Sequence, residues 1–238
     1  MTRAHSSPFA RTVIDVIAPQ LGIATMLDHG CGRGSDVHHY RTSGLDADGW
    51  DPHPGFGQAI EPERQYDLVT NIFVLNVLPD PWQRIQAIQH AARFVRPGGH
   101  LFVVTRSPAD IDPRAIPANW RTHHDGYWSS EAKGTFQKGI PTEEIIALGH
   151  QAGLRPTTQQ IPLKTSPAAG QALLVKPKWS GSTPVTATGH RSGTLGGSPA
   201  GVGRPDDSGA RRPGTPTPPR PARGDAVTPL RPVDGRPG

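Results

Sequence analysis

The sequence predicts an α/β fold, in which a mostly parallel sheet carries helices on both faces and ends in a terminal antiparallel β-hairpin. Short apolar runs that end in an acid alternate with segments whose apolar residues recur at helical spacing. A stretch with glycines at alternate positions, 30–34, lies between the first apolar run and a helical segment. A run, a loop and a helix in this order form a β–α unit, so we expect the sheet to be built from such units.

A helix is predicted at the start of the chain, because Ser7 is a good N-cap and Pro8 suits the first helical position. Apolar residues recur at helical spacing as far as Gly22, which ends the helix. The remaining elements follow from apolar spacing, caps and glycine stops: strands at 24–28, 45–51, 66–73, 100–105, 157–163 and 171–176, and helices beginning at 35, 80 and 141.

The glycine stretch predicts a ligand-binding loop. Gly30, Gly32 and Gly34 come directly after the strand that ends in Asp28. Glycine permits positive φ and a close approach of the backbone, and such a loop before a helix points backbone N–H groups at a ligand. The second strand ends in Asp51, where an acid can bind ribose hydroxyls. Loop and acid together predict a site for a nucleoside cofactor.

The glycine spacing separates two families of cofactor sites. The dinucleotide fingerprint requires G-x-G-x-x-G, whereas this chain has G-x-G-x-G with Asp28 two residues ahead. This pattern resembles motif I of the class I S-adenosylmethionine-dependent methyltransferases. Three later features agree with it: a leucine-rich turn that leads to Pro79-Asp80, the run Arg96-Pro97-Gly98-Gly99 before a strand, and the terminal hairpin.

The resemblance covers roughly residues 10–176 and implies a Rossmann-like fold, S-adenosyl-L-methionine as cofactor and methyl transfer as activity. A helix that covers the cofactor cleft in the family corresponds to 7–22, which would make this helix a lid or a sheet-packing helix. The implied cofactor-binding residues are Asp28, Gly30, Cys31, Gly32, Gly34, Asp51, Pro52, Asn71 and Phe73. Cys31 is interpreted as a small residue that fits the loop rather than as a nucleophile.

The chain departs from the family between its second strand and Tyr66. The 14 residues 52–65 are too few for a full helix, strand and helix, so the third β–α unit is predicted to be shortened or lost. The acid that binds adenine after the third strand in the family has no clear equivalent here. His53 or Phe56 could stack against the base instead.

Residues 106–140 are predicted to form a long irregular segment that recognises the substrate as a lid, because it leaves the carboxyl end of a core strand. His123, His124 and Tyr127, with Asp125, are the candidates for taking a proton from the methyl acceptor. Two adjacent histidines without further Cys or His nearby make a poor metal site, so no metal is expected.

Composition divides the chain at residue 176. Residues 177–238 hold 12 Pro and 12 Gly, and we expect them to form a disordered tail. Residues 1–176, the predicted methyltransferase domain, carry 16 Lys plus Arg and 16 Asp plus Glu, so the net charge of +5 belongs to the tail. A single cysteine excludes an internal disulfide, and neither a signal peptide nor a membrane span is recognisable. A cytoplasmic protein is therefore expected.

Three functions stay open at this point. A small molecule is the favoured methyl acceptor, since the neutral core gives little attraction for phosphate. The second reading is an accessory methyltransferase of a DNA modification or defence system, because several motifs are similar to a group of methyltransferases associated with bacterial DNA phosphorothioation. The third is a non-catalytic protein that binds the cofactor or a partner. The sequence identifies neither the acceptor nor the oligomeric state.

Overall fold

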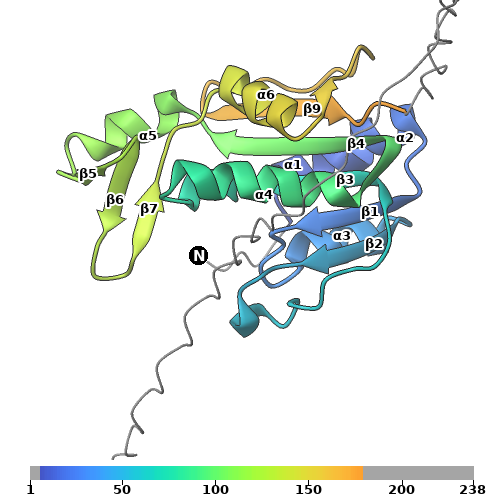
Figure 1. The fold of residues 1–238 in the computed structure, drawn as a ribbon, viewed down its shortest axis with the longest axis horizontal. Helices are drawn as coiled ribbons and strands as arrows, with labels where there is room; N and C mark the ends of the chain where they lie inside the picture. Colours follow the sequence, from blue (N-terminus) through green and yellow to red (C-terminus); the bar gives the residue numbers. More distant parts are fainter. Residues whose placement is uncertain (1–5, 179–238) are drawn as a thin grey trace, which may run out of the picture. The chain divides into compact units, whose positions relative to one another are not determined.

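The computed structural model describes residues 6–178, which hold a six-stranded sheet with helices on both faces (Figure 1). The strands of this sheet are β1 (Thr25–His29), β2 (Asp46–Trp50), β3 (Tyr66–Ile72), β4 (Val95–Arg106), β8 (Arg155–Pro156) and β9 (Ala169–Val175). They stand in the order β2-β1-β3-β4-β9-β8; the first four are parallel, and β9 is antiparallel to both of its neighbours. The predicted fold class is confirmed.

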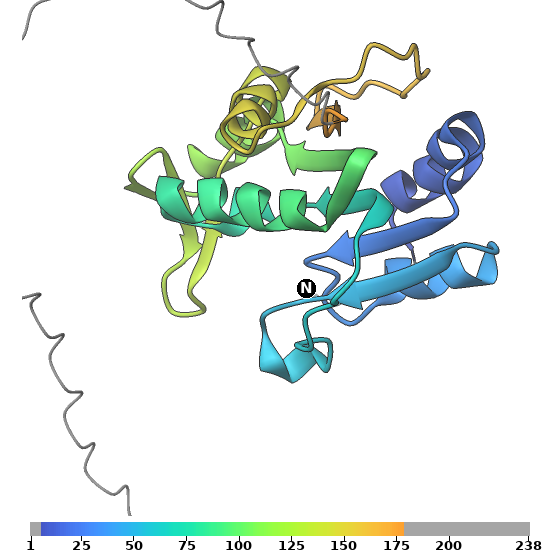
Figure 2. The same cartoon turned by 45° about the vertical axis from the view of Figure 1, so that its right-hand side comes forward.

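Helices cover the two faces of the sheet in two groups (Figures 1 and 2). The helices are α1 (Pro8–Thr12), a π-helical turn (Val13–Ile17), α2 (Ala18–Leu21), α3 (Ser35–Thr42), α4 (Pro81–Phe94), α5 (Pro108–Ala115) and α6 (Thr142–Gln151). One apolar core lies under α4 and α6, and the other lies under α3 and the N-terminal helices. No helix within residues 6–178 is both long and apolar enough to cross a membrane.

The N-terminal helix forms as its cap residues predict. Ser7 Oγ accepts the N–H of Ala10 at 2.9 Å, and Val13 and Ile17 are buried in the core beside α3. The helix therefore packs on the sheet. Its first turn also reaches the carboxyl edge of β3, where the ring of Phe9 lies 5.5 Å from that of Phe73.

The third β–α unit is shortened, as predicted. Between β2 and β3 the chain holds a single 3-10 turn, Pro54–Phe56, and no strand. The loop is fastened to β2 by Arg64, whose guanidinium donates to Asp46 at 2.6 and 2.8 Å and to Asp48 at 2.7 and 3.0 Å. β2 is therefore the outermost strand on this side of the sheet.

The segment 106–140 is not irregular, which corrects the prediction. It contains α5 and a separate three-stranded antiparallel sheet of β5 (Arg121–His123), β6 (Gly126–Ser130) and β7 (Thr135–Gln137). These strands are short, and their alternation is too brief for a period-two pattern to emerge from the sequence. The small sheet lies beyond the carboxyl end of β4 (Figure 1).

The predicted strand at 157–163 is also wrong. Its place is taken by β8, only two residues long, and residues 157–163 have no strand of their own. The terminal pair is still antiparallel, because Arg155 and Pro156 pair with Val175 and Leu174 on β9. The predicted tail 177–238 lies outside the described residues, apart from positions 177 and 178, so the boundary at 176 stays a prediction.

Candidate functional site

The carboxyl ends of three neighbouring strands bring the predicted cofactor residues together. Asp28 on β1 pairs in register with Gly49 on β2 and with Thr70 on β3, so these strands end at the same level. Ligands of open α/β sheets bind at this edge. The loops that follow the three strands therefore form the candidate site.

The glycine loop after β1 needs its glycines for conformation and for space. Gly30, Gly32 and Gly34 have φ values of +85°, +57° and +80°, a region that side chains disfavour. A Cβ on Gly30 would collide with Val74 Cγ2, and the Gly30 N–H donates to the Trp50 carbonyl at 2.7 Å. The loop is thereby held between the ends of β2 and β3.

Asp51 connects the acid after β2 to the glycine loop. Its Oδ2 accepts the N–H of Gly32 at 2.9 Å, and its Oδ1 accepts the N–H of His53 at 2.9 Å. The residue is buried, whereas its neighbour Pro52 is exposed. Each carboxylate oxygen has two lone pairs, so the backbone bonds orient the carboxylate and leave acceptor capacity for hydroxyl groups.

Two further residues of this loop region have structural partners. The buried Asp28 carboxylate accepts a hydrogen bond from Thr70 Oγ1 at 2.7 Å, which ties β1 to β3. Burial and the carboxylates of Asp28 and Asp51 raise the pKa of the Cys31 thiol to about 12. Cys31 therefore stays protonated at neutral pH, in agreement with its interpretation as a small packing residue.

The end of β3 supplies Asn71 and Phe73. Asn71 is fully buried, and its Nδ2 lies 3.2 Å from His29 Nδ1 and 3.4 Å from the His29 carbonyl. Phe73 has a φ of +60°, rare for a residue with a side chain, and the guanidinium carbon of Arg106 lies 5.8 Å from the centre of its ring. Such strain is often maintained where function requires it.

His53 and Phe56, the two candidates for stacking on adenine, stack on each other. Their ring centres are 4.6 Å apart with an interplanar angle of 30°. Both belong to the loop after Asp51, which returns toward β2 because Asp51 N donates to the Gln58 carbonyl at 3.0 Å. The guanidinium carbon of Arg33 lies 5.9 Å from the Phe56 ring, which places this aromatic pair beside the glycine loop.

A cluster of rings beside the glycine loop, of which only His29 is almost fully buried, was not predicted. It contains the rings of His29, Trp50 and His90, whose centres are 4.6–5.1 Å apart. His29 Nε2 lies 2.8 Å from His90 Nδ1, and His90 Nε2 lies 3.3 Å from Glu61 Oε1. The only signal in the sequence is a histidine at the end of a buried strand, because its partner is 61 residues away on α4.

The candidates for proton transfer lie in the small sheet. The His123 ring packs 5.2 Å from Trp128 and 6.2 Å from Phe136, while His124 occupies a turn with a φ of +49°. Burial and Asp112 raise the pKa of Tyr127. Within residues 6–178, no hydrogen bond joins these three side chains to the glycine loop, and no group of three or more His, Cys, Asp or Glu could hold a metal ion.

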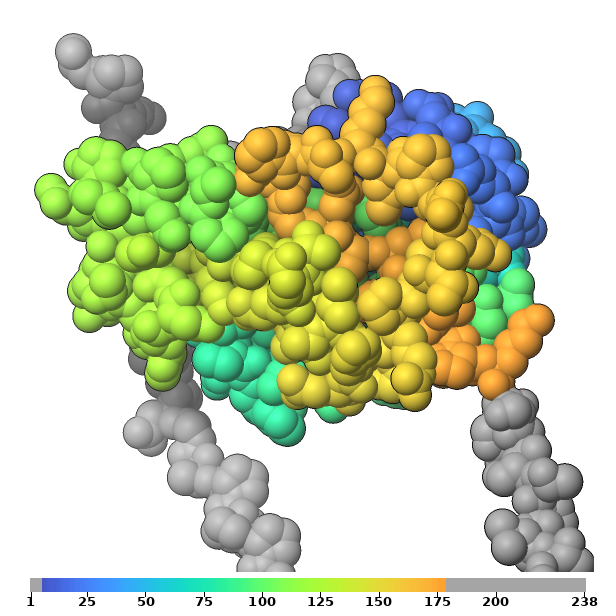
Figure 3. Space-filling view, turned by 90° about the horizontal axis from the view of Figure 1, so that it is seen from above, coloured from blue at the N-terminus to red at the C-terminus, as the bar shows by residue number. Residues whose placement is uncertain are grey.

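Asp125 anchors the small sheet rather than offering a free base. It accepts hydrogen bonds from Arg84 of α4 at 2.5 and 2.7 Å and from Lys138 Nζ at 2.7 Å. Lys138 also donates to Glu144 of α6 at 2.6 Å, and the space-filling view shows the green and yellow segments in contact (Figure 3). Burial alone would raise the pKa of Asp125, but the bonds from Lys138 and Arg84 hold it below its usual value.

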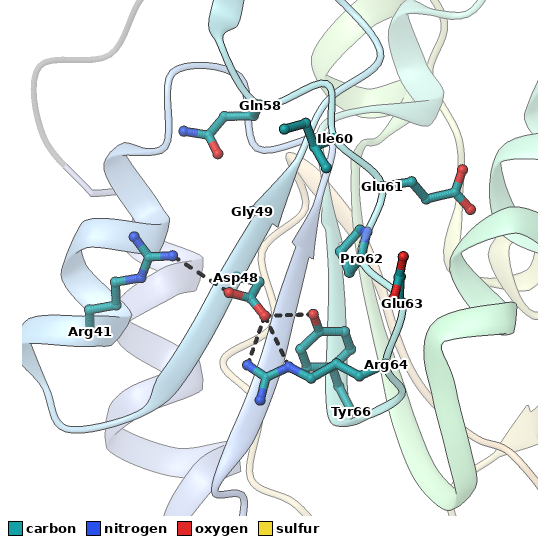
Figure 4. A pocket seen from close by; sticks show the side chains of 10 residues that line it. All are labelled: Arg41, Asp48, Gly49, Gln58, Ile60, Glu61, Pro62, Glu63, Arg64 and Tyr66. Carbon is teal, nitrogen blue, oxygen red and sulfur yellow. Dashed lines mark hydrogen bonds and ion pairs between the residues drawn. The ribbon is translucent and has the colours of Figure 1, made fainter.

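A depression of about 470 Å³, lined by residues other than those of the candidate site, lies along the outer edge of β2 (Figure 4). Asp48 is at its centre and binds Arg64 at 2.7 Å and the Tyr66 hydroxyl at 2.6 Å, with Arg41 at 3.7 Å. Because Arg64, Tyr66 and Arg41 all bind the central Asp48, these side chains fasten the loop to the outer edge of β2.

The arrangement at the carboxyl edge fits a nucleoside cofactor with a charged amino-acid portion. The left-handed glycine loop leaves room for a close ligand, and Asp51 offers carboxylate oxygens for hydroxyl groups. Asn71 Oδ1 is buried and has no hydrogen-bond partner among the described residues. A buried carbonyl without a partner is costly, so it suits an N–H donor of a ligand.

Comparison with known proteins identifies the family of this domain. The family model described as "Methyltransferase domain" matches residues 5–159. No match was found among curated protein sequences.

Three solved structures show the same fold. An S-adenosylmethionine-dependent methyltransferase from Clostridium acetobutylicum has a TM-score of 0.53 and 10% identity, covering 71% of this chain and 90% of that one. The sugar N-methyltransferase KedS8 from Streptoalloteichus has a TM-score of 0.53 and 18% identity, covering 71% and 87%. The CcbJ methyltransferase from Streptomyces caelestis has a TM-score of 0.50 and 13% identity, covering 72% and 91%. The chain belongs to the methyltransferase domain family, which confirms the predicted class I S-adenosylmethionine-dependent methyltransferase.

Proposed function

We propose that the chain transfers a methyl group from S-adenosylmethionine to a polar small molecule. The observation that carries this proposal is the hydrogen bond from Gly32 to Asp51, which joins the glycine loop and the ribose acid into one rigid unit. The two predicted halves of the cofactor site thus depend on each other for their positions.

The surroundings of each predicted cofactor-binding residue suit contact with one part of the cofactor. Asp51 would bind the ribose hydroxyls, and the backbone of Gly30 to Gly34 would lie along the methionine portion. Asn71 and Phe73 would border the methyl group, where β3 ends. Pro52, exposed directly after the ribose acid, would cover the adenine side together with the stacked pair of His53 and Phe56.

S-Adenosylmethionine supplies a methyl group on a sulfonium, which an oxygen or nitrogen nucleophile can attack directly. The chain therefore has to orient the acceptor, exclude water and accept a proton. His123 and His124 are the candidate proton acceptors of the small sheet. Tyr127 keeps its proton at neutral pH because burial and a hydrogen bond to Asp112 raise its pKa, so it would contact the methyl acceptor through its oxygen rather than take a proton from it.

The small sheet of residues 121–137 is proposed to recognise the acceptor. It follows the carboxyl end of β4, and Asp125 and Lys138 fix it to α4 and α6. Its face carries aromatic rings and histidines rather than a run of cations, which suits a polar ring or an amine better than a phosphate backbone. A sugar N-methyltransferase of the same fold is in line with an amine acceptor on a sugar.

The experiment that tests this function is calorimetric titration of the full chain with S-adenosylhomocysteine, with NADH as the control. Micromolar binding of the first and no binding of the second is the expected result. Binding of neither compound would contradict the proposal. A radiolabelled methyl-transfer screen over amino sugars, hydroxylated rings and duplex DNA then identifies the acceptor.

The same screen separates the two alternative functions. Transfer to duplex DNA alone would favour an accessory enzyme of a DNA modification or defence system. Cofactor binding without transfer to any acceptor would favour a non-catalytic cofactor-binding or partner-binding protein.

A further inference from the structure

His29, which is buried, and His90, which is partly buried, form a directly bonded pair that the proposed reaction leaves without a role. His29 is the last residue of β1, next to Gly30, and its side chain is almost fully buried. His90 lies on α4 and is largely buried, while its outer partner Glu61 is exposed in the loop that replaces the third strand. A chain of polar contacts thus leads from the protein surface to the end of β3.

Four residues form this series of polar contacts. Asn71 Nδ2 is 3.2 Å from His29 Nδ1, His29 Nε2 is 2.8 Å from His90 Nδ1, and His90 Nε2 is 3.3 Å from Glu61 Oε1. The Arg93 guanidinium also lies 3.5 Å from Glu61 Oε1, and Trp50 and Phe94 pack against the His90 ring.

The groups at the two ends of this series of contacts determine which atom donates and which accepts in each hydrogen bond. The carboxylate of Glu61 only accepts, so His90 carries a proton on Nε2. At the other end the His29 carbonyl also only accepts, and Asn71 Nδ2 lies 3.4 Å from it, so the NH₂ group of Asn71 faces His29. His29 must then donate from Nε2 and accept on Nδ1. Burial and the neighbouring His90 lower the pKa of His29 to about 3, so this ring is neutral at neutral pH.

Because the NH₂ group of Asn71 faces His29, its Oδ1 atom is on the side away from His29. A side-chain amide can normally flip to satisfy its oxygen, but a flip here would place Oδ1 against the lone pair of His29 Nδ1. Asn71 Oδ1 is consequently left buried without a hydrogen-bond partner among the described residues. It lies one residue before the end of β3, beside the glycine loop.

We propose that His29 and His90 are positioning residues which, together with Glu61, lock the Asn71 amide so that its Oδ1 accepts a hydrogen bond from the ammonium group of the bound cofactor. This inference rests on the proposed function, because the ammonium belongs to the methionine portion of S-adenosylmethionine. It assigns to the loop that replaces the third strand a part in cofactor recognition through Glu61.

The first test measures the tautomers directly in the full chain without ligand. Long-range ¹H–¹⁵N spectra at neutral pH are expected to show His29 with its proton on Nε2. A proton on Nδ1 would overturn the inference. In Asn71→Asp the carboxylate requires a donor, so His29 is expected to move its proton to Nδ1; an unchanged tautomer in that variant would also contradict it.

The second test measures binding of S-adenosylhomocysteine and of an analogue that lacks only the α-amino group. The wild-type chain is expected to prefer the amino compound by about tenfold or more. His90→Phe, which keeps the ring but removes both nitrogens, should lose this preference without losing affinity for the analogue. The control His150→Phe, an exposed position on α6, should keep it.

Glu61→Ala repeats the test at an exposed position, where folding is not at risk, with Glu63→Ala as the matched control. Loss of the preference only in Glu61→Ala supports the inference. An unchanged preference in both Glu61→Ala and His90→Phe overturns it, while the proposed function stands. If the wild-type chain binds neither compound, the proposed function itself is wrong. The tautomer measurement needs no ligand, so it tests the arrangement of His29 and Asn71 separately from the proposed function.

Discussion

Asp51 Oδ2 and Gly32 N are joined by a hydrogen bond of 2.9 Å, so the acid after β2 and the loop after β1 form a single unit. Replacing Asp51 by alanine removes this bond, the one to His53 and the proposed acceptor for the ribose hydroxyls. We expect Asp51→Ala to weaken binding of S-adenosylhomocysteine by about 1–3 kcal/mol, measured by calorimetry. The exposed Glu143→Ala is the control. An unchanged dissociation constant in Asp51→Ala would exclude Asp51 from the site.

Gly30 and Gly44 offer a matched comparison of space and conformation. Both have positive φ, +85° and +92°, but a Cβ on Gly44 meets nothing within 4 Å, whereas one on Gly30 collides with Val74. Gly44→Ala should cost about 1 kcal/mol of unfolding free energy, from the strained backbone alone. Gly30→Ala should cost about 1–3 kcal/mol more.

Denaturant unfolding measures both of these variants. Adding Val74→Ala to Gly30→Ala makes room for the new methyl group, so it should recover part of the loss. Equal losses in the two single glycine variants would show that the contact with Val74 is not what requires glycine at position 30.

Asp125 should make stability depend on acid pH. Its pKa is held below the unfolded value by Lys138 and Arg84, so its contribution is present above the unfolded pKa and is lost as pH falls through the folded pKa. Asp125→Ala should lose about 1–3 kcal/mol at neutral pH, less than for a fully buried pair because the carboxylate is 40% exposed.

Melting temperatures from neutral to acidic pH test this prediction. The curve of Asp125→Ala should be flatter than that of the wild type. Glu131→Ala, which removes the exposed ion pair with Arg121, is the control and should change stability by less than about 1 kcal/mol. Parallel curves for wild type and Asp125→Ala would contradict the role of Asp125.

Cys31 should react slowly with thiol reagents in the folded chain. Its pKa of about 12 leaves little thiolate at neutral or mildly basic pH, and thiolate is the reactive form. Labelling by iodoacetamide, followed by mass spectrometry, should be much faster after unfolding in guanidinium chloride. Equal rates in folded and unfolded chain would show that the thiol is neither buried nor shielded by the two carboxylates.

The fold and the glycine loop could be predicted because their signals are local. The alternate glycines of 30–34 and the acid at 51 are encoded by short spacings that a strand and a tight turn require. The absence of a third strand could be predicted from length alone, since 14 residues cannot hold one with its helices. Residue spacing and segment length can both be read from the sequence without knowing which distant residues are in contact.

The small sheet and the histidine pair could not be predicted, because they depend on distant partners. β5 and β7 are three residues each, too short for a periodic signal, and are stabilised by Arg84, 41 residues before Asp125. β8 has only two residues and forms on the edge of β9. Such strands are fixed by tertiary packing rather than by their own propensity.

Arg64 has a consequence for how the molecule behaves in a crowded solution. The outermost strand of a sheet carries unpaired backbone groups, which can join the edge of another molecule and start aggregation. Here the strand that would normally cover β2 is missing, yet Arg64 lies across Asp46 and Asp48 and places three charges along that edge. A neighbouring strand would have to strip water and break these ion pairs to add there, so the charges of Arg64, Asp46 and Asp48 disfavour edge-to-edge pairing at β2.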